Sequence, residues 1–406
     1  MSRLSCCVAI LGVLIAGFGN GAKCFTYSHF EFDPKHPILS ETFQNELSQQ
    51  SHSELSLFKE AAVLLNAVPS LNKKTELAQK ATRSIYLSTM VFYGVRDSEM
   101  DELLKVLIDK AQQGIPIYFI VDDYLSSFGS NHIEQLQEAG VHVAFFNTSQ
   151  DDYPGSIRWH EKLFIVDDEY AIVGGQNLYN QDYPFVPFDF KWRDTDVYLS
   201  GPVAKEFSKH FRNVWKKLTR SLIKSPPAIE FCPPDERTPK EKRDHTGEVR
   251  FIYNEPYQGK KYLTQAYKAL IAKAQHTIIW QGNNLYLNDE FNHLILEAAH
   301  RGVNVYLVTN SISTSWWQTF YYVYHAWFGY KPFKDSPVHL CLYQERFNHS
   351  KMLYIDGVVS AIGSANHDSY SLENDAESTA LIYDRNFNRD LYYNVILKDL
   401  ESTDCS

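Results

Sequence analysis

The sequence has little cysteine, no cluster of metal-ligating residues and no excess of positive charge. Its six cysteines form no Cys-x-x-Cys motif and no Cys/His cluster, so nothing predicts a metal site or a cofactor. Lys and Arg number 39 against 49 Asp and Glu, a net charge of −10, which argues against a protein that mainly binds nucleic acid. A locally basic cleft could still bind nucleic acid even though the protein as a whole is acidic. Hydrophobic residues make up 44% and aromatic residues 14% of the chain, as in a folded globular protein.

The first residues of the chain have the pattern of a secretory leader. Arg3 precedes an apolar stretch at residues 8–18, and small and polar residues follow at 19–22. The stretch is shorter than the roughly 20 apolar residues of a membrane span. We therefore expect a cleaved signal peptide at residues 1–22 and an exported chain (periplasmic, secreted or lumenal), with an uncleaved membrane anchor as the alternative. Cleavage would leave four cysteines, which allow two disulfides or buried thiols: Cys24, Cys232, Cys341 and Cys405.

Two parts of the sequence repeat the same order of elements. In each part a short strand precedes an amphipathic helix, a glycine suited to end that helix, and a second apolar strand. The first copy comprises residues 84–87, 99–113, Gly114 and 117–121, and the second comprises 277–280, 290–301, Gly302 and 303–309. Strands that alternate with helices predict an α/β fold in each half. We expect an N-terminal extension at 23–74, a first half at 75–224, a proline-rich and charged linker at 225–250 and a second half at 251–406.

Each half also carries one copy of a polar motif. Both copies read His-x-Lys, four residues, Asp, six residues, then Gly-[Gly/Ser]-x-Asn. A single His-x-Lys would be an accident of the surface, but two copies with matched glycine and asparagine point to a shared site. The first copy contains His160, Lys162, Asp167, Gly175 and Asn177, and the second contains His349, Lys351, Asp356, Ser364 and Asn366.

The spacing of the motif predicts a β-hairpin with its polar residues on one side. The His and the Lys are two residues apart, so on a strand they share a face. Asp356-Gly357 is a strong two-residue turn, and Asp167-Asp168 occupies the equivalent place. Such turns put a small residue opposite each imidazole, with room for a phosphate, and an asparagine at the same end. The expected sets are His349 with Ser364 and Asn366, and His160 with Gly175 and Asn177.

These side chains suit phosphodiester chemistry. A neutral imidazole can attack phosphorus to form a phosphohistidine, and a second, protonated imidazole can give its proton to the leaving oxygen. Two lysines and two asparagines can balance the charge on the non-bridging oxygens, so no metal is needed. The sequence therefore predicts one active site built from both motifs, without a cofactor.

The paired motifs resemble those of the phospholipase D superfamily over roughly residues 75–390, and within it the bacterial cardiolipin synthase and phospholipase D-like branch. The segments 192–203 and 301–311 carry the same resemblance. It implies two homologous α/β halves packed face to face around one shared active site. It also implies a carboxylate behind each catalytic histidine. The candidates are Asp194, 34 residues after His160, and Glu377, 28 residues after His349.

The resemblance further implies roles for the motif residues. We expect His160 to attack phosphorus and His349 to act as acid and base, although the reverse assignment stays open. Asp167 and Asp356 are expected to stabilise the hairpins rather than to touch substrate. One departure is Tyr370, which stands where many relatives have an arginine and puts a shared headgroup preference in doubt.

The substrate predicted on these grounds is a phospholipid at a membrane surface, whose phosphatidyl group is hydrolysed or transferred through a phosphohistidine. The alternatives are a cardiolipin synthase-type transferase and a nuclease that uses the same site, with nucleic acid the less favoured substrate. An aromatic stretch at 315–330 suits a membrane-facing element, a stacking platform for bases or a helix packed between the halves. Because both motifs lie in one chain, we expect a monomer to be active.

Overall fold

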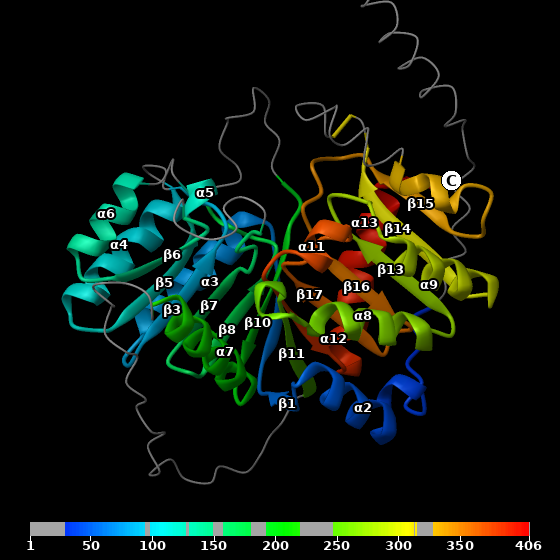
Figure 1. Cartoon of the computed structure of the whole chain (residues 1–406), viewed down its shortest axis with the longest axis horizontal. Helices are drawn as coiled ribbons and strands as arrows, with labels where there is room; N and C mark the ends of the chain where they lie inside the picture. Colours follow the sequence, from blue (N-terminus) through cyan, green and yellow to red (C-terminus); the bar gives the residue numbers. More distant parts are fainter. Residues whose placement is uncertain are drawn as a thin grey trace, which may run out of the picture.

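The computed structural model describes residues 29–93, 98–126, 130–148, 157–179, 192–219, 247–311, 313–314 and 328–405. These residues form two halves, each built on one mixed β-sheet with helices around it (Figure 1). The strands of the first sheet lie in the order β2-β10-β8-β7-β3-β5-β6. Their bounds are β2 (Ala61–Leu65), β3 (Ile85–Thr89), β5 (Ile117–Asp122), β6 (His142–Phe146), β7 (Leu163–Val166), β8 (Tyr170–Gly174) and β10 (Thr195–Ser200).

The second sheet repeats this strand order and extends it. Its order is β1-β11-β18-β17-β16-β13-β14-β15-β19, with β12 paired to β11, so the run from β18 to β15 matches the run from β10 to β6. The predicted α/β fold with two homologous halves is therefore confirmed. The bounds are β1 (Leu55–Phe58), β11 (Gly247–Glu255), β12 (Lys260–Lys261), β13 (Thr277–Gln281), β14 (Asn304–Asn310), β15 (His339–Tyr343), β16 (Met352–Ile355), β17 (Val359–Gly363), β18 (Glu377–Ile382) and β19 (Thr403–Cys405).

Helices pack against both faces of the sheets (Figure 1). In the first half these are α3 (Ala67–Lys80), α4 (Glu99–Gln112), α5 (Asp123–Ser126), α6 (Ser130–Glu138) and α7 (Val203–Leu218). The others are η1 (Pro37–Leu39), α2 (Glu41–Ser51), η3 (Pro256–Gln258), α8 (Tyr262–Lys273), α9 (Asp289–His300), η5 (Lys331–Phe333), α11 (Ser369–Glu373), α12 (Arg385–Leu391), the π-helical turn η6 (Tyr392–Ile396) and α13 (Leu397–Glu401). A separate pair of short strands, β4 (Phe92–Tyr93) and β9 (Leu178–Tyr179), completes the described elements.

The equivalent helices α4 and α9 begin and end as the sequence predicts. At their N-termini Ser98 accepts a hydrogen bond from the Asp101 N–H (3.3 Å) and Asn288 accepts one from the Phe291 N–H (3.0 Å). At their C-termini Gly114 (φ 87°) and Gly302 (φ 92°) take the left-handed conformation that ends a helix and that glycine adopts without strain. Each helix therefore returns the chain to the next parallel strand of its sheet.

The two sheets pack face to face through one shared apolar core. β8 and β10 of the first half contribute Val173 and Val197 to it, and β17 and β18 of the second half contribute Ile362 and Ala380. The helix α7 joins this core, because the ring of its Phe207 lies 4.1 Å from that of Phe251 in β11, centroid to centroid. Two further cores fill the space between each sheet and its outer helices. The shared core fixes the position of one motif relative to the other.

The residues that precede the first half connect the two sheets. β1 lies at the edge of the second sheet, antiparallel to β11, and β2 lies at the edge of the first sheet, antiparallel to β10. The expected start of the first half at residue 75 falls inside α3, and the expected start of the second half at residue 251 falls inside β11. The expected leader (1–22) and residues 225–246 of the expected linker lie outside the described residues.

One disulfide is present among the described residues. Cys341 in β15 and Cys405 in β19 are bonded, and the two strands pair antiparallel at this point. Cys24 and Cys232 lie outside the described part of the chain. In the part that is described, every helix is too short or too polar to traverse a bilayer.

Candidate active site

Both motifs end in a tight hairpin of the predicted backbone conformation. Asp167 and Asp168 have φ values of 58° and 57°, and Asp356 and Gly357 have values of 53° and 70°. Two successive residues in the left-handed region are what a type I′ turn requires, and Asp and Gly tolerate it. The hairpins β7–β8 and β16–β17 therefore turn at the positions that the sequence predicts.

The register of these hairpins differs from the prediction by one residue. Ile355 pairs with Val359, so one residue more than expected lies in the loop, and the first hairpin has the same spacing. A shift of one residue changes every cross-strand partner. The predicted pairing of His349 with Ser364, and of His160 with Gly175, is therefore wrong.

The motif aspartates tie each hairpin to the loop that precedes a central strand. Asp167 accepts hydrogen bonds from the backbone N–H groups of residues 82, 83 and 84 at 2.8–2.9 Å, and one from the Thr82 hydroxyl. Asp356 accepts from the N–H groups of residues 275–277 and lies 2.9 Å from Nε2 of His36. The structure thus places both aspartates at the turns, in the stabilising position expected from the sequence.

The two histidines lie just before their strands, where each half touches the other. Residues 158–160 run parallel to residues 375–377, and the His160 N–H donates to the Ala376 carbonyl (3.0 Å). In the equivalent contact the His349 N–H donates to the Arg193 carbonyl (2.7 Å). Both imidazoles are buried, with 5% and 6% of His160 and His349 exposed. The site therefore lies in the seam between the halves, as the resemblance implied.

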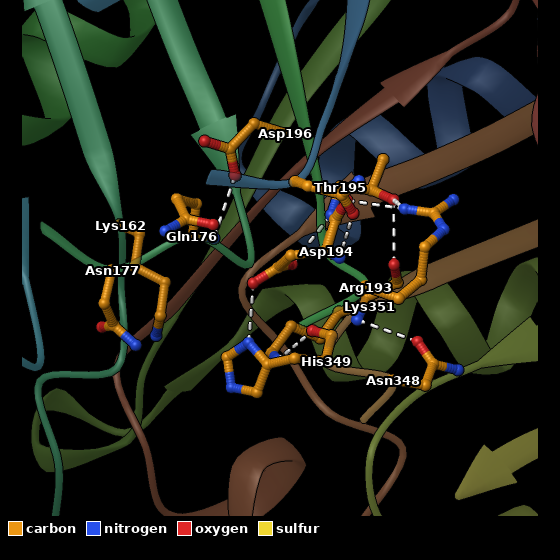
Figure 2. A network of polar contacts seen from close by, with 12 residues as sticks. Lys162, Gln176, Asn177, Arg193, Asp194, Thr195, Asp196, Asn348, His349 and Lys351 are labelled. Atoms are coloured by element: carbon orange, nitrogen blue, oxygen red, sulfur yellow. Dashed lines mark hydrogen bonds and ion pairs between the residues drawn. The ribbon is translucent and has the colours of Figure 1, made fainter. Parts of the chain in front are cut away.

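The orienting carboxylates are exchanged between the halves. Nδ1 of His160 lies 2.6 Å from Oε1 of Glu377. Nδ1 of His349 lies 2.7 Å from Oδ2 of Asp194, and Figure 2 shows this second pair. Sequence distance associates Asp194 with His160 and Glu377 with His349, but the structure pairs each histidine with the carboxylate of the other half. A carboxylate at Nδ1 holds the imidazole in the tautomer that leaves Nε2 as the reacting nitrogen.

The small residues of the motifs make room for these carboxylates. A Cβ atom on Gly175 would lie 2.0 Å from Oδ1 of Asp194, so glycine is required there. Ser364, at the equivalent position, donates its hydroxyl to Oε2 of Glu377 and accepts from the Ser378 N–H (3.0 Å). From the sequence we expected this space to hold a phosphate of the substrate. The structure shows that the carboxylate behind the imidazole occupies it.

The lysines and asparagines of the motifs are also buried in the site. The ammonium groups of Lys162 and Lys351 donate to the carbonyls of His160 and His349, two residues earlier in each motif. Oδ1 of Asn177 accepts from the Val91 N–H and the Thr89 hydroxyl, both at 3.2 Å, which leaves its NH₂ group as a donor. Asn366 is 7% exposed, and its buried oxygen has no partner among the described residues.

Burial and mutual repulsion shift the basic groups of the site toward their neutral forms. Burial, with Lys351 nearby, lowers the pKa of His349 to about 3, and burial with Lys162 lowers that of His160 well below its ordinary value. Burial lowers the pKa of Lys162 to about 8 and that of Lys351 to about 7. An anionic phosphodiester beside these groups would favour their protonated forms. The cluster is thus suited to bind an anion and to offer a neutral imidazole as nucleophile.

The two orienting carboxyls differ in charge. Burial would raise the pKa of Asp194, but its interaction with His349 and Lys351 outweighs burial and lowers it. Burial dominates at Glu377 and raises its pKa to about 7. At neutral pH Asp194 is therefore ionised, whereas Glu377 is divided between its two forms.

Sequence reasoning missed a buried polar network behind the second motif. Arg193 forms a two-pronged ion pair with Asp399 of α13, with both N–O distances 2.8 Å (Figure 2 shows Arg193 beside Asp194). The Thr195 hydroxyl lies 2.9 Å from that of Ser350 and joins β10 to the second motif. Arg193 and Thr195 flank Asp194 in the segment that carries the resemblance, so a signal existed. Nothing in the sequence marks Asp399.

One group of side chains in the described residues has the spacing of metal ligands. It consists of His160, Asp375 and Glu377, each with one ligand atom within 4.8 Å of the others. The bond between His160 and Glu377 already uses one atom of each. Phosphoryl charge in this site can be balanced by the two lysines.

Two further expectations concern the surroundings of the site. Residues 315–327 of the aromatic stretch lie outside the described residues, and its last residues, 328–330, are helical. Tyr370 lies in the short helix α11, with 43% of its surface exposed.

A two-histidine site in a seam between repeated α/β halves defines a phospholipase D-like fold. The family model described as "Cardiolipin synthase, PLD-like domain" matches residues 75–215 and 267–394. The chain belongs to this family. Its membership confirms the predicted superfamily and the enzyme class of phospholipase D-like phosphodiesterases and transphosphatidylases.

Individual relatives agree with this membership. The chain is 28% identical over 351 residues to a cardiolipin synthase of Geobacillus sp. (strain WCH70), covering 84% of this chain and 67% of the relative. It is 28% identical over 336 residues to a cardiolipin synthase of Geobacillus kaustophilus, covering 81% and 64%. The chain thus spans about two thirds of the length of these relatives. The fold is similar to the crystal structure of the phosphatidylserine synthase of Haemophilus influenzae Rd KW20 (TM-score 0.65, 13% identity, 89% and 92% of the two chains).

The comparisons correct one expectation from the sequence. The curated relatives are bacterial cardiolipin synthases, and their similarity to this chain gives no support to export or secretion. The prediction of an exported protein is therefore wrong. An apolar segment after a basic residue has the composition of a leader, but composition alone does not distinguish a leader from other apolar segments.

Proposed function

We propose that the chain is a transphosphatidylase of the cardiolipin synthase type, which moves the phosphatidyl group of one phospholipid to a hydroxyl of an acceptor. The observation that carries this proposal is the crossed pair of buried imidazoles, each held at Nδ1 by a carboxylate of the opposite half. Transfer is favoured over hydrolysis because the curated relatives are named as synthases. The burial of both histidines favours it too, since a dry site keeps water from the intermediate.

The proposed reaction has two steps. In the first, Nε2 of His160 attacks phosphorus, a P–N bond forms, the P–O bond to the headgroup breaks, and His349 gives its proton to the leaving oxygen. In the second, His349 takes the proton of the acceptor hydroxyl, the acceptor oxygen attacks phosphorus, and the P–N bond breaks. Glu377 balances the positive charge of the phosphohistidine, while Lys162, Lys351, Asn177 and Asn366 stabilise the charge on the non-bridging oxygens.

The other proposed features follow from this reaction. The substrate is a phospholipid at a membrane surface, and both motifs lie in one chain, so a monomer contains a complete site. Asp167 and Asp356 act through the hairpins, and Gly175 and Ser364 act by accommodating and binding the orienting carboxylates.

Incubation of the purified chain with phosphatidylglycerol vesicles tests the proposal. The expected products are cardiolipin and free glycerol in equal amounts. Formation of phosphatidic acid without cardiolipin would show that the chain hydrolyses the phospholipid and would contradict the proposed transfer. Cleavage of single-stranded DNA with no lipid product would reject both and make the chain a nuclease. The variant His160→Asn is the control for activity of other proteins in the preparation.

A further inference from the structure

The two histidines differ in the residue that lies two positions before the orienting carboxyl. Trp192 precedes Asp194, and Asp375 precedes Glu377. Residues two apart in an extended segment face the same side, so each of these residues faces the imidazole that its carboxylate orients. The ring of Trp192 lies 5.0 Å from the ring of His349, centroid to centroid. The same position behind His160 is occupied by a second carboxyl group.

Asp375 is fixed close to the other two groups. It is 4% exposed, and its Oδ1 accepts a hydrogen bond of 2.9 Å from the Arg158 N–H. Ligand atoms of Asp375, Glu377 and His160 lie within 4.8 Å of one another. Asp375 therefore approaches the site from the strand segment that carries Glu377.

We propose that Asp375 is a positioning residue, which holds one proton in common with Glu377 and so sets the charge behind His160. This inference rests on the proposed function, since it gives Asp375 a role at a proposed catalytic histidine. Two buried carboxyls at this separation cannot both ionise without a large cost, so the pair keeps one proton. His349 has no such control, because an aromatic ring takes the place of the second acid.

The charges around the pair agree with a shared proton. Burial, followed by repulsion from Glu377 and Asp368, raises the pKa of Asp375 well above its ordinary value. The other titratable groups that face the pair come from four elements: Lys162 and Lys351 of the motifs, Arg158 before the first motif, and Asp368 and Tyr370 at α11. The two lysines stabilise one negative charge on the pair, and the neighbouring Asp368 opposes a second.

The variant Asp375→Asn removes the charge and the proton but keeps an oxygen that can accept from the Arg158 N–H. We expect Glu377, freed from a like charge, to ionise at a pH at least about one unit lower. The ionisation near neutrality in the pH profile of kcat/KM should move to lower pH by the same amount. The value of kcat at pH 7 should stay within about tenfold of that of the unsubstituted enzyme. The control Asp384→Asn alters an N-cap of α12 outside the site and should leave the profile unchanged.

Infrared absorption of protonated carboxyl groups provides a readout that needs no activity. The unsubstituted chain should show a carboxyl that loses its proton near neutral pH, and this titration should move to lower pH in Asp375→Asn and stay unchanged in Asp384→Asn. The signal should also persist in Asp368→Asn, which removes the neighbouring acid. An unchanged infrared titration in Asp375→Asn, or a superimposable pH profile, would overturn the inference. If the infrared signal behaves as expected but no lipid is transferred, the shared proton stands and the proposed function fails.

Discussion

The two motif hairpins share a turn, a register and a lysine-to-carbonyl bond, but they are supported differently. Asp167 in the first half is bound by the Thr82 hydroxyl, whereas Asp356 in the second is bound by His36 from the N-terminal segment. Asp194 behind His349 is held in its ionised form, whereas Glu377 behind His160 has a pKa of about 7. The common features place the reacting groups. The differences teach that the two copies have diverged in proton affinity, which agrees with the proposed roles of one histidine as nucleophile and the other as acid and base.

The largest expected effect comes from the histidines themselves. His160→Asn and His349→Asn should each lower phosphatidyl transfer by at least about 10⁴-fold, because His160 carries the phosphatidyl group and the second step depends on His349 to activate the acceptor. The comparison becomes sharper in a single turnover with labelled phospholipid, followed by mass spectrometry of the protein. Only His349→Asn should accumulate a phosphohistidine. A phosphohistidine found in the His160→Asn variant would instead make His349 the nucleophile and His160 the acid and base.

The orienting carboxylates should rank next and unequally. At pH 7 Asp194→Asn removes a full negative charge, and we expect a loss in kcat of about 10³-fold. Glu377→Gln replaces a group that is protonated in part, so we expect a loss of about 10²-fold. The ratio should narrow at pH 8.5, where Glu377 is ionised in the unsubstituted enzyme. Equal losses in kcat for the two variants at pH 7 would contradict the inferred difference in charge between Asp194 and Glu377.

Lys351→Met should abolish transfer while it stabilises the fold. The pKa of Lys351 falls from its ordinary 10.5 to about 7 on folding, so between these values the unfolded chain binds a proton that the native chain lacks. The destabilisation is full below pH 7 and is lost as the pH rises toward 10. Methionine removes it, with an expected gain of roughly 1–2 kcal/mol at pH 6 that shrinks by pH 9. Thermal unfolding at both pH values measures this, with the exposed Lys105→Met as control.

The smallest effects should come from the supports of the motif aspartates. His36→Ala removes the partner of a buried carboxylate and should lower the free energy of unfolding by about 2–3 kcal/mol. Thr82→Val removes one of several donors to Asp167 and should cost about 1 kcal/mol. Urea unfolding of both variants tests the ranking. A larger loss for Thr82→Val would mean that the N-terminal segment does not support the second hairpin.

The repeat, the hairpins and the motif residues were predictable because short spacings encode them. Glycines after helices and Asp-Gly turns act within a few residues, so Gly114, Gly302 and Asp356 indicate structure directly. The hairpin register was not predictable, since one extra loop residue changes it without altering the turn signal. The exchange of Asp194 and Glu377 between histidines depends on how two sheets pack, and the contributions of His36 and Asp399 depend on residues distant in the chain.

Because the carboxylates are crossed, both histidine–carboxylate bonds depend on how the two sheets are aligned. Each imidazole lies on one sheet and its carboxylate on the other, at 2.6 and 2.7 Å, so sliding of one sheet by about 1 Å would break both bonds together. Neither repeat can change the residues that it contributes to the seam without a matching change in the other repeat. The two copies are thus bound to coevolve like the subunits of an obligate dimer, although a single polypeptide contains them.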